Sequence, residues 1–150
     1  MPFTLDSRLA GDTHEVARLE LCRLLLMDDA RFLWLILVPE REGVREIHEL
    51  APADRAVLIE EVARVAEALT GLHRPDKINV GALGNVVPQL HVHVVARFHN
   101  DAAWPGPVWG SGPAVGHGEG ELRVRLGELR GVFEAQNRGK EDKESPFPQP

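Results

Sequence analysis

The chain has few of the features that mark extracellular and membrane proteins. Its 150 residues include one cysteine, Cys22, which excludes an internal disulfide framework and is typical of a reducing compartment. Cys22 lies in an apolar run, so we expect a buried thiol rather than a reactive one. The longest apolar run, Phe32–Val38, is far shorter than the roughly 20 residues that span a bilayer.

The chain also lacks an excess of positive charge and a recognisable targeting segment. Its net charge of −6 argues against a general nucleic-acid binder and against an anionic membrane surface as partner, although one local positive pocket remains compatible with it. Residues 1–6 have neither the basic nor the apolar region of a signal peptide. We therefore expect a soluble cytoplasmic protein that binds neither a nucleic acid polymer nor a membrane.

Length and hydropathy indicate one domain. A chain of 150 residues with 43% hydrophobic residues is ordinary for a globular domain that buries about 70% of its unfolded surface. We expect this domain to cover residues 1–136. Residues 137–150 are charged and proline-rich, which predicts a disordered tail. No internal repeat is present.

The pattern of apolar residues predicts strands on either side of one long helix. The expected elements are a short helix around 6–10, strands 19–27 and 32–38, a helix at 53–71, strands 77–83 and 90–98, and a helix at 119–134. The helix at 53–71 has an apolar stripe, Pro75 prevents its continuation, and Gly71 is placed to cap it. This order is typical of an α+β fold: an antiparallel sheet with a main helix on one face, followed by a C-terminal helix.

Residues 89–95 read Gln-Leu-His-Val-His-Val-Val and carry the strongest functional signal. Because side chains alternate along a strand, Gln89, His91 and His93 point to one face, and the intervening apolar residues point to the other. We expect the apolar set to be buried and the polar set to lie on the surface.

Three interpretations of the two histidines follow from the residues alone. The strand could simply be solvated there. The pair could bind a metal ion with a third ligand from elsewhere, for which the candidates are His99, His117 and Asp101. Finally, a neutral imidazole, with an ordinary pKa near ~6.5, is a competent nucleophile toward an electrophilic phosphorus.

The motif resembles the signature of the histidine triad (HIT) superfamily: His, apolar, His, apolar, His, apolar, apolar. The strand at 78–81, the Gly84-Asn85 loop, the strand end at 35–39 and the intervening helix also fall where that family has them. The resemblance covers about residues 15–98. It implies a HIT-like fold, a homodimer, and hydrolysis or transfer at a nucleotide α-phosphate through a nucleotidyl-histidine intermediate.

The resemblance also implies roles for individual residues. His91 matches the nucleophile, and His93 matches the last triad histidine, which contacts phosphate. Gln89, at the first triad position, is counted with them as a catalytic residue. The nucleotide- or phosphate-binding counterparts are Asn79, Gly84, Asn85 and Asp28. It implies no cofactor and no resident metal. For Asp28, simple turn chemistry is an equal alternative.

The chain departs from the family pattern at three places. The first triad position is Gln89, which donates and accepts hydrogen bonds but does not titrate. Val86 stands where one branch of the family has serine, and the loop at 81–89 is one residue shorter than in that branch. These departures favour, as the alternative function, a nucleotide-binding regulatory protein with little turnover.

Three tryptophans complete the candidates. Trp34 lies in an apolar strand, and we expect it in the core. Trp104 and Trp109 follow the motif in a Gly- and Pro-rich loop. They could stack on a base, contact a partner subunit, or cover the sheet.

Overall fold

The computed structural model describes residues 2–144. The chain divides into two compact parts, and the boundary in the sequence falls between His117 and Gly118. In chain order the elements are α1 (Ser7–Asp12), β1 (Thr13–Arg18), β2 (Cys22–Met27), β3 (Leu33–Pro39), the 3-10 helix η1 (Ile47–Glu49), α2 (Pro52–His73), β4 (Lys77–Gly81), β5 (Val92–Arg97) and α3 (Glu119–Glu144). Among these residues, no helix combines the length and apolar character needed to cross a membrane.

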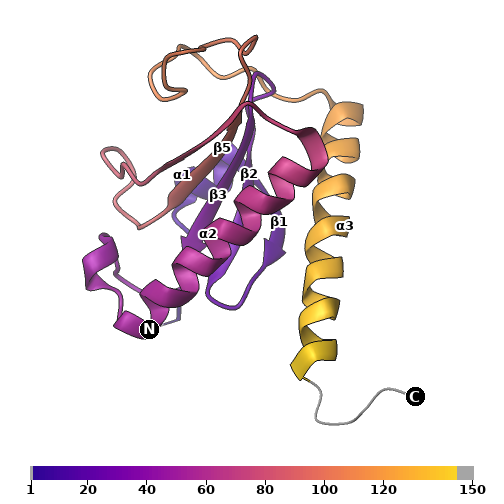
Figure 1. The fold of residues 1–150 in the computed structure, drawn as a ribbon. Coiled ribbons are helices and arrows are strands. Elements are labelled where there is room, and N and C mark those ends of the chain that lie inside the picture. The colour runs from indigo at the N-terminus through magenta and orange to yellow at the C-terminus, as the bar shows by residue number, and fades with distance from the viewer. Residues whose placement is uncertain (1, 145–150) are drawn as a thin grey trace. The chain divides into compact units, whose positions relative to one another are not determined.

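The first part is built on a five-stranded sheet with the order β1-β2-β3-β5-β4, in which every neighbouring pair is antiparallel. Strand β3 lies at the centre, and all of its residues are buried. Helix α2 lies across one face of the sheet (Figure 1) and contacts β3 and β5. The predicted α+β architecture, with the long helix on one face of an antiparallel sheet, is confirmed.

Helix α2 forms where its apolar stripe predicts it, and Leu58, Val62, Val65 and Leu69 are buried. Its end differs from the prediction, because the helix runs through Gly71 to His73. Arg74 then takes the left-handed conformation, with φ 47°, and its N–H bonds the carbonyl of Thr70. The proline that follows disfavours the right-handed α conformation at Arg74, which explains why the cap falls there.

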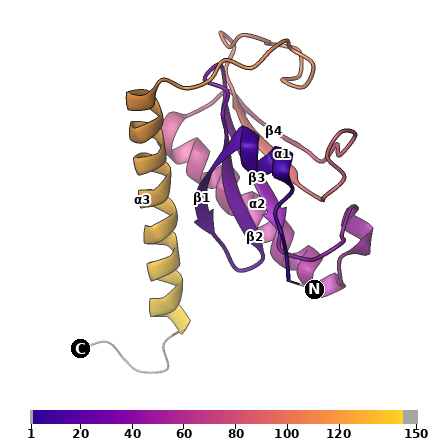
Figure 2. The same ribbon diagram turned by 180° about the vertical axis from the view of Figure 1, so that it is seen from behind.

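The opposite face of the sheet is covered as well. Helix α1 and the N-terminal segment lie on that side (Figure 2), together with the segment at 98–113 that follows β5. The buried cluster there consists of Leu9, Leu25, Phe32, Trp34, Ile36, Val38, Val87, Val95 and Val108. The expectation that His91 and His93 lie on an open surface is therefore wrong, because other parts of the chain cover both faces of β5.

Two further elements differ from their predicted bounds. The predicted strand 19–27 is a turn followed by β2, and β1 precedes it at a place where no strand was expected. β1 is an edge strand with mixed burial, so its side chains lack the clear alternation of a half-buried strand. Helix α3 ends at Glu144 rather than at 134. The tail expected at 137–150 thus begins inside this helix, and residues 145–150 lie outside the described range.

The single cysteine has the environment that the sequence predicts. Cys22 is 1% exposed at the start of β2. Burial and the neighbouring Glu61 carboxylate raise the pKa of its thiol far above the ordinary value. Both Glu61 oxygens accept backbone N–H bonds, from Leu21 and Cys22, so this carboxylate holds the turn between β1 and β2. Cys22 is a core residue.

Candidate active site

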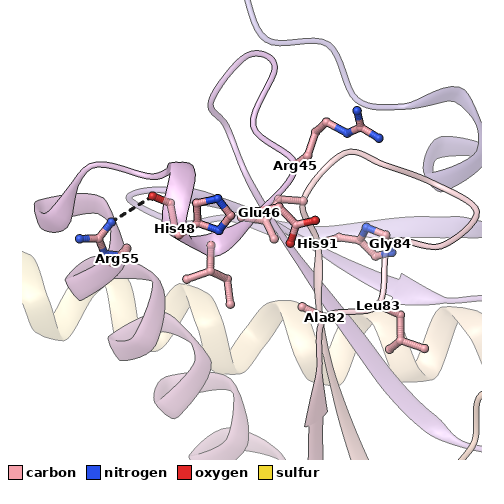
Figure 3. A pocket seen from close by; sticks show the side chains of 10 residues that line it. Arg45, Glu46, His48, Arg55, Ala82, Leu83, Gly84 and His91 are labelled. Carbon is pink, nitrogen blue, oxygen red and sulfur yellow. Dashed lines mark hydrogen bonds between the residues drawn. The ribbon is translucent and has the colours of Figure 1, made fainter.

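A pocket of about 650 Å³ lies at the end of the sheet where β5 begins (Figure 3). Its lining comes from the segment before η1, η1 itself, the first turn of α2, the β4–β5 loop and the start of the motif. The lining residues are Arg45, Glu46, Ile47, His48, Arg55, Ala82, Leu83, Gly84, Leu90 and His91. The N–H of Leu90 donates to the carbonyl of Val44 at 3.0 Å, which ties the first of these segments to the motif.

His91 is the motif histidine that lines this pocket. It is 7% exposed, and its Nδ1 lies 2.7 Å from the backbone carbonyl oxygen of Gln89. A carbonyl oxygen only accepts hydrogen bonds, so Nδ1 carries the proton. In the neutral ring the lone pair is then on Nε2. The bond to the backbone thus favours the tautomer with a free Nε2, and a histidine that attacks through Nε2 requires this tautomer.

His93 is held in the opposite tautomer. The indole Nε1–H of Trp34 donates to His93 Nδ1 at 2.9 Å, so the proton of the neutral His93 ring lies on Nε2. The ring is 5% exposed, and burial, followed by the nearby His91, lowers its pKa to about 4. His93 is therefore a neutral N–H donor at pH 7. Its ring centroid is 4.9 Å from that of His91.

Two tryptophans enclose His93. The centroids of Trp34 and Trp109 lie 5.6 and 5.4 Å from the His93 ring. Trp109 reaches this position because Gly81 has no side chain: a Cβ there would meet the indole Cη2 at 3.0 Å. Trp109 therefore packs on the sheet beside His93 and Trp34. Trp34 is a core residue, as predicted.

The segment that carries Trp109 is held by an ion pair at the end of β5. Arg97 donates from Nε and Nη2 to both oxygens of Asp101, at 2.8 and 3.0 Å, and these side chains are 1% and 5% exposed. The guanidinium of Arg97 holds the pKa of Asp101 well below its usual range. Asp101 also accepts the backbone N–H groups of Phe98, Ala103 and Trp104.

Asn79 belongs to this ion-pair region and not to the pocket. Its Oδ1 accepts a 2.8 Å bond from Nη1 of Arg97, and it does not line the cavity. Sequence reasoning missed the roles of Arg97 and Asp101. An arginine that ends an apolar strand, with an aspartate four residues later, is the signal that could have identified them.

The side chain of Gln89 forms hydrogen bonds with the N-terminal segment. Its Oε1 accepts from the N–H of Asp6 and its Nε2 donates to the carbonyl of Thr4, both at 2.9 Å. An amide that donates and accepts matches an extended backbone, which offers one group of each kind. What Gln89 contributes to His91 is its backbone carbonyl.

The structure separates the remaining predicted positions. Gly84 lines the pocket, with φ 70°, a conformation that glycine adopts without strain. Asn85 is exposed and does not line it. Asp28 accepts bonds from the backbone N–H and Nδ1 of His117, at 3.0 and 2.8 Å, and these bonds lower its pKa. Because Asp28 follows β2, it lies at the end of the sheet opposite His91.

The residues proposed as a third metal ligand are engaged elsewhere. Asp101 pairs with Arg97, His117 bonds Asp28, and His99 Nδ1 lies 3.7 Å from Asp76. Within residues 2–144 no group of three His, Cys, Asp or Glu side chains is arranged to hold a metal ion.

The sequence analysis missed three basic residues of the pocket: Arg45, His48 and Arg55. They lie in the polar link before α2 and in its first turn, where neither periodicity nor spacing relates them to His91. Only the fold brings them to the motif.

The comparisons with known proteins agree with this geometry. A model of the HIT domain matches residues 9–100. Solved histidine triad proteins superpose closely: one from Bradyrhizobium japonicum has 42% identity and a TM-score of 0.85, covering 88% of this chain and 98% of that one. One from Sinorhizobium meliloti has 48% identity and a TM-score of 0.84, covering 87% and 96%.

A third histidine triad protein, from Marinobacter aquaeolei, has 43% identity and a TM-score of 0.87, covering 90% of this chain and 98% of that one. No curated protein matches the chain. The family model spans more than half of the sequence, and these structures share its fold at 42–48% identity. The chain belongs to the HIT domain family.

Proposed function

We propose that the protein hydrolyses or transfers a nucleotidyl group, with His91 as the nucleophile that attacks an α-phosphate. One observation carries this proposal: the carbonyl of Gln89 holds the Nδ1 proton of His91, which leaves the Nε2 lone pair on a histidine that lines a pocket. A nucleophile oriented by a hydrogen bond to its second nitrogen follows the general logic of covalent catalysis. HIT family membership supports this class of reaction.

The reaction proceeds in two displacements. Nε2 of His91 forms a bond to the α-phosphorus while the bond from phosphorus to the leaving group breaks, and the leaving group takes the electron pair. Water then attacks the nucleotidyl-histidine, which releases the nucleotide and restores His91. His93, neutral with its proton on Nε2, is the candidate donor to a phosphate oxygen. We assign no step to Asn79, Asn85 or Asp28, whose side chains do not line the pocket.

The test is to trap the intermediate. The protein is mixed with a dinucleoside polyphosphate labelled at the α-phosphate and quenched within one turnover; label bound to the chain, stable in alkali and released by acid, is the expected result. His91→Ala should lose the label and lower kcat/KM at least about a thousandfold. His99→Ala, a histidine whose side chain is 70% exposed, is the matched control and should retain both. Full turnover by His91→Ala would refute the assignment.

The second candidate function is nucleotide binding with little turnover. The side chain of Gln89 favours it, because that amide bonds backbone groups and does not titrate. Calorimetry with AMP, together with product analysis over a panel of nucleotides, separates the two functions. Binding without product or trapped label supports the second.

We also propose a homodimer formed through β4. This strand lies at the sheet edge, and with the loop after it exposes Val80 (52%), Leu83 (45%) and Val86 (70%). An apolar edge strand is a template for pairing with a second copy. Sedimentation velocity should give twice the monomer mass, and Val80→Lys should give the monomer.

We also propose that the protein is cytoplasmic and that a nucleotide is its only ligand. The buried cysteine and the net charge of −6 support these choices. Microscopy of a tagged chain tests the first.

A further inference from the structure

The pocket at His91 extends to a second wall that the proposed chemistry does not yet use. This wall consists of Arg45 and His48, from the segment around η1, and Arg55, from the first turn of α2. In Figure 3, His48 and Arg55 lie on the side of the view away from Gly84, whereas Arg45 lies above His91 and its guanidinium extends away from that ring. Because the same cavity reaches His91, a molecule attached at that histidine can extend to this wall.

The two guanidinium groups are available to a ligand. Arg55 donates only from Nη1, to the carbonyls of His48 at 3.4 Å and Leu50 at 2.7 Å. These bonds fix the arginine and leave Nε and Nη2 without a partner among residues 2–144. Over the same range, the guanidinium of Arg45 forms no hydrogen bond or ion pair. By contrast, several other arginines pair with carboxylates: Arg23 with Glu40, Arg31 with Asp29, Arg41 with Asp54 and Arg97 with Asp101.

The local charge of the wall is positive. The pocket has one carboxylate, Glu46, which accepts the backbone N–H of Glu49 in a capping box. Two guanidinium groups against one carboxylate leave a net positive charge when the histidines are neutral. In a chain with a net charge of −6, this concentrates cationic groups where an anion would bind.

We propose that Arg45 and Arg55 form a subsite for the phosphates of the leaving group, so that the enzyme prefers substrates that release a phosphate anion over substrates that release a neutral amine. This inference rests on the proposed function. With the α-phosphate at Nε2 of His91, we expect the phosphates beyond it to lie in the same cavity, which Arg45 and Arg55 line. The pocket volume of about 650 Å³ is within the ordinary range for nucleotide-sized ligands.

The chemistry gives the subsite its effect on rate. When Nε2 bonds to the α-phosphorus, the phosphorus–oxygen bond to the bridging oxygen breaks, and its electron pair remains on the departing phosphate. Guanidinium groups neutralise this developing negative charge through charge-assisted hydrogen bonds. An amine leaving group departs after taking up a proton and develops no negative charge, so it gains nothing from the same groups.

The experiment compares two substrates with the same nucleotidyl group: a diadenosine tetraphosphate and adenosine 5′-phosphoramidate. In Arg45→Glu, kcat/KM for the tetraphosphate should fall at least about tenfold, whereas kcat/KM for the phosphoramidate should stay within about twofold. Arg45→Lys keeps the charge and should recover most of the loss. Arg8→Glu changes the net charge equally but lies in α1, outside the pocket, and should alter neither substrate.

Failure of the subsite proposal and failure of the proposed function give different results. An equal fall for both substrates in Arg45→Glu, or no fall for either, overturns the subsite and leaves the proposed function intact. A wild-type enzyme that processes only the phosphoramidate does the same. If the wild type turns over neither substrate and traps no label, the proposed function is wrong and the subsite falls with it.

Discussion

The two motif histidines lie only two residues apart at the start of β5, yet they have different environments. His91, at the start of β5, lines a pocket, and its Nε2 is left without a proton by the bond from Nδ1 to a carbonyl. His93, on the same face, is enclosed by indole rings and accepts a bond on Nδ1. Strand alternation gives both residues the same face. What covers that face determines that one can be a nucleophile and the other a fixed donor.

Charged groups fix the surroundings of His93, whereas the backbone shapes those of His91. Over His93 the cover is the segment at 98–113, held by the buried pair of Arg97 and Asp101. At His91 the β4–β5 loop turns at Gly84, and the chain around η1 stays far enough away to leave a cavity. Substitutions at each set of contacts separately test whether the surroundings of His91 and His93 are independent.

Removing the ion pair should have the largest effect on stability. Arg97→Met leaves Asp101 buried without its cation, and we expect a loss of about 3–5 kcal/mol in the free energy of unfolding, measured in urea. All three tryptophans of the chain lie on this side of the sheet, so their fluorescence should report the loosening. Arg18→Met removes an exposed pair with Glu15 and should cost less than about 1 kcal/mol. Equal losses in the two variants would contradict the structural role of the buried pair.

Acid should destabilise the fold through the buried ring of His93. Its folded-state pKa of about 4 lies below the ordinary ~6.5, so the unfolded chain takes up the proton first as the pH falls. The stability due to the neutral ring is complete above about pH 6.5 and is lost between about pH 6.5 and 4. From pH 7.5 to 5 this amounts to about 2 kcal/mol.

The check is a difference between variants. Urea unfolding of His93→Gln at both pH values should show a pH dependence about 2 kcal/mol smaller than that of the wild type. His99→Gln changes an exposed histidine and should keep the wild-type dependence. If His93→Gln follows the wild-type curve, the neutral buried ring is not the source of the acid sensitivity.

Substitution of Gln89 should have the smallest effect. Gln89→Ala removes the two bonds to Thr4 and Asp6, and we expect a loss of about 1–2 kcal/mol in stability. The carbonyl that orients His91 remains, so kcat should change less than about threefold. Gln89→Glu keeps the acceptor for Asp6 and loses the donor to Thr4, and should be intermediate in stability. A hundredfold fall in kcat with unchanged stability would instead place the amide in the chemistry.

Much of the fold followed from local patterns. The stripe on α2 and the apolar run of β3 predict both elements to within a few residues, because each buries a face or stripe continuous in sequence. β1 was missed because an edge strand with mixed burial lacks a clean period. The predicted C-cap of α2 is three residues early: Gly71 is a residue that often caps helices, but the helix continues until the proline after Arg74 prevents another turn.

The motif strand marks the boundary between what the sequence determined and what the tertiary structure decided. By themselves, the residues place His91 and His93 on one face of a strand and relate that strand to a phosphate-handling family. They do not tell which ring lines a pocket, that the side chain of Gln89 bonds the N-terminal segment, or that Arg45 and Arg55 line the same pocket as His91. Alternation is a property of neighbouring residues, whereas cover and cavity depend on contacts between segments more than thirty residues apart, which only the folded chain brings together.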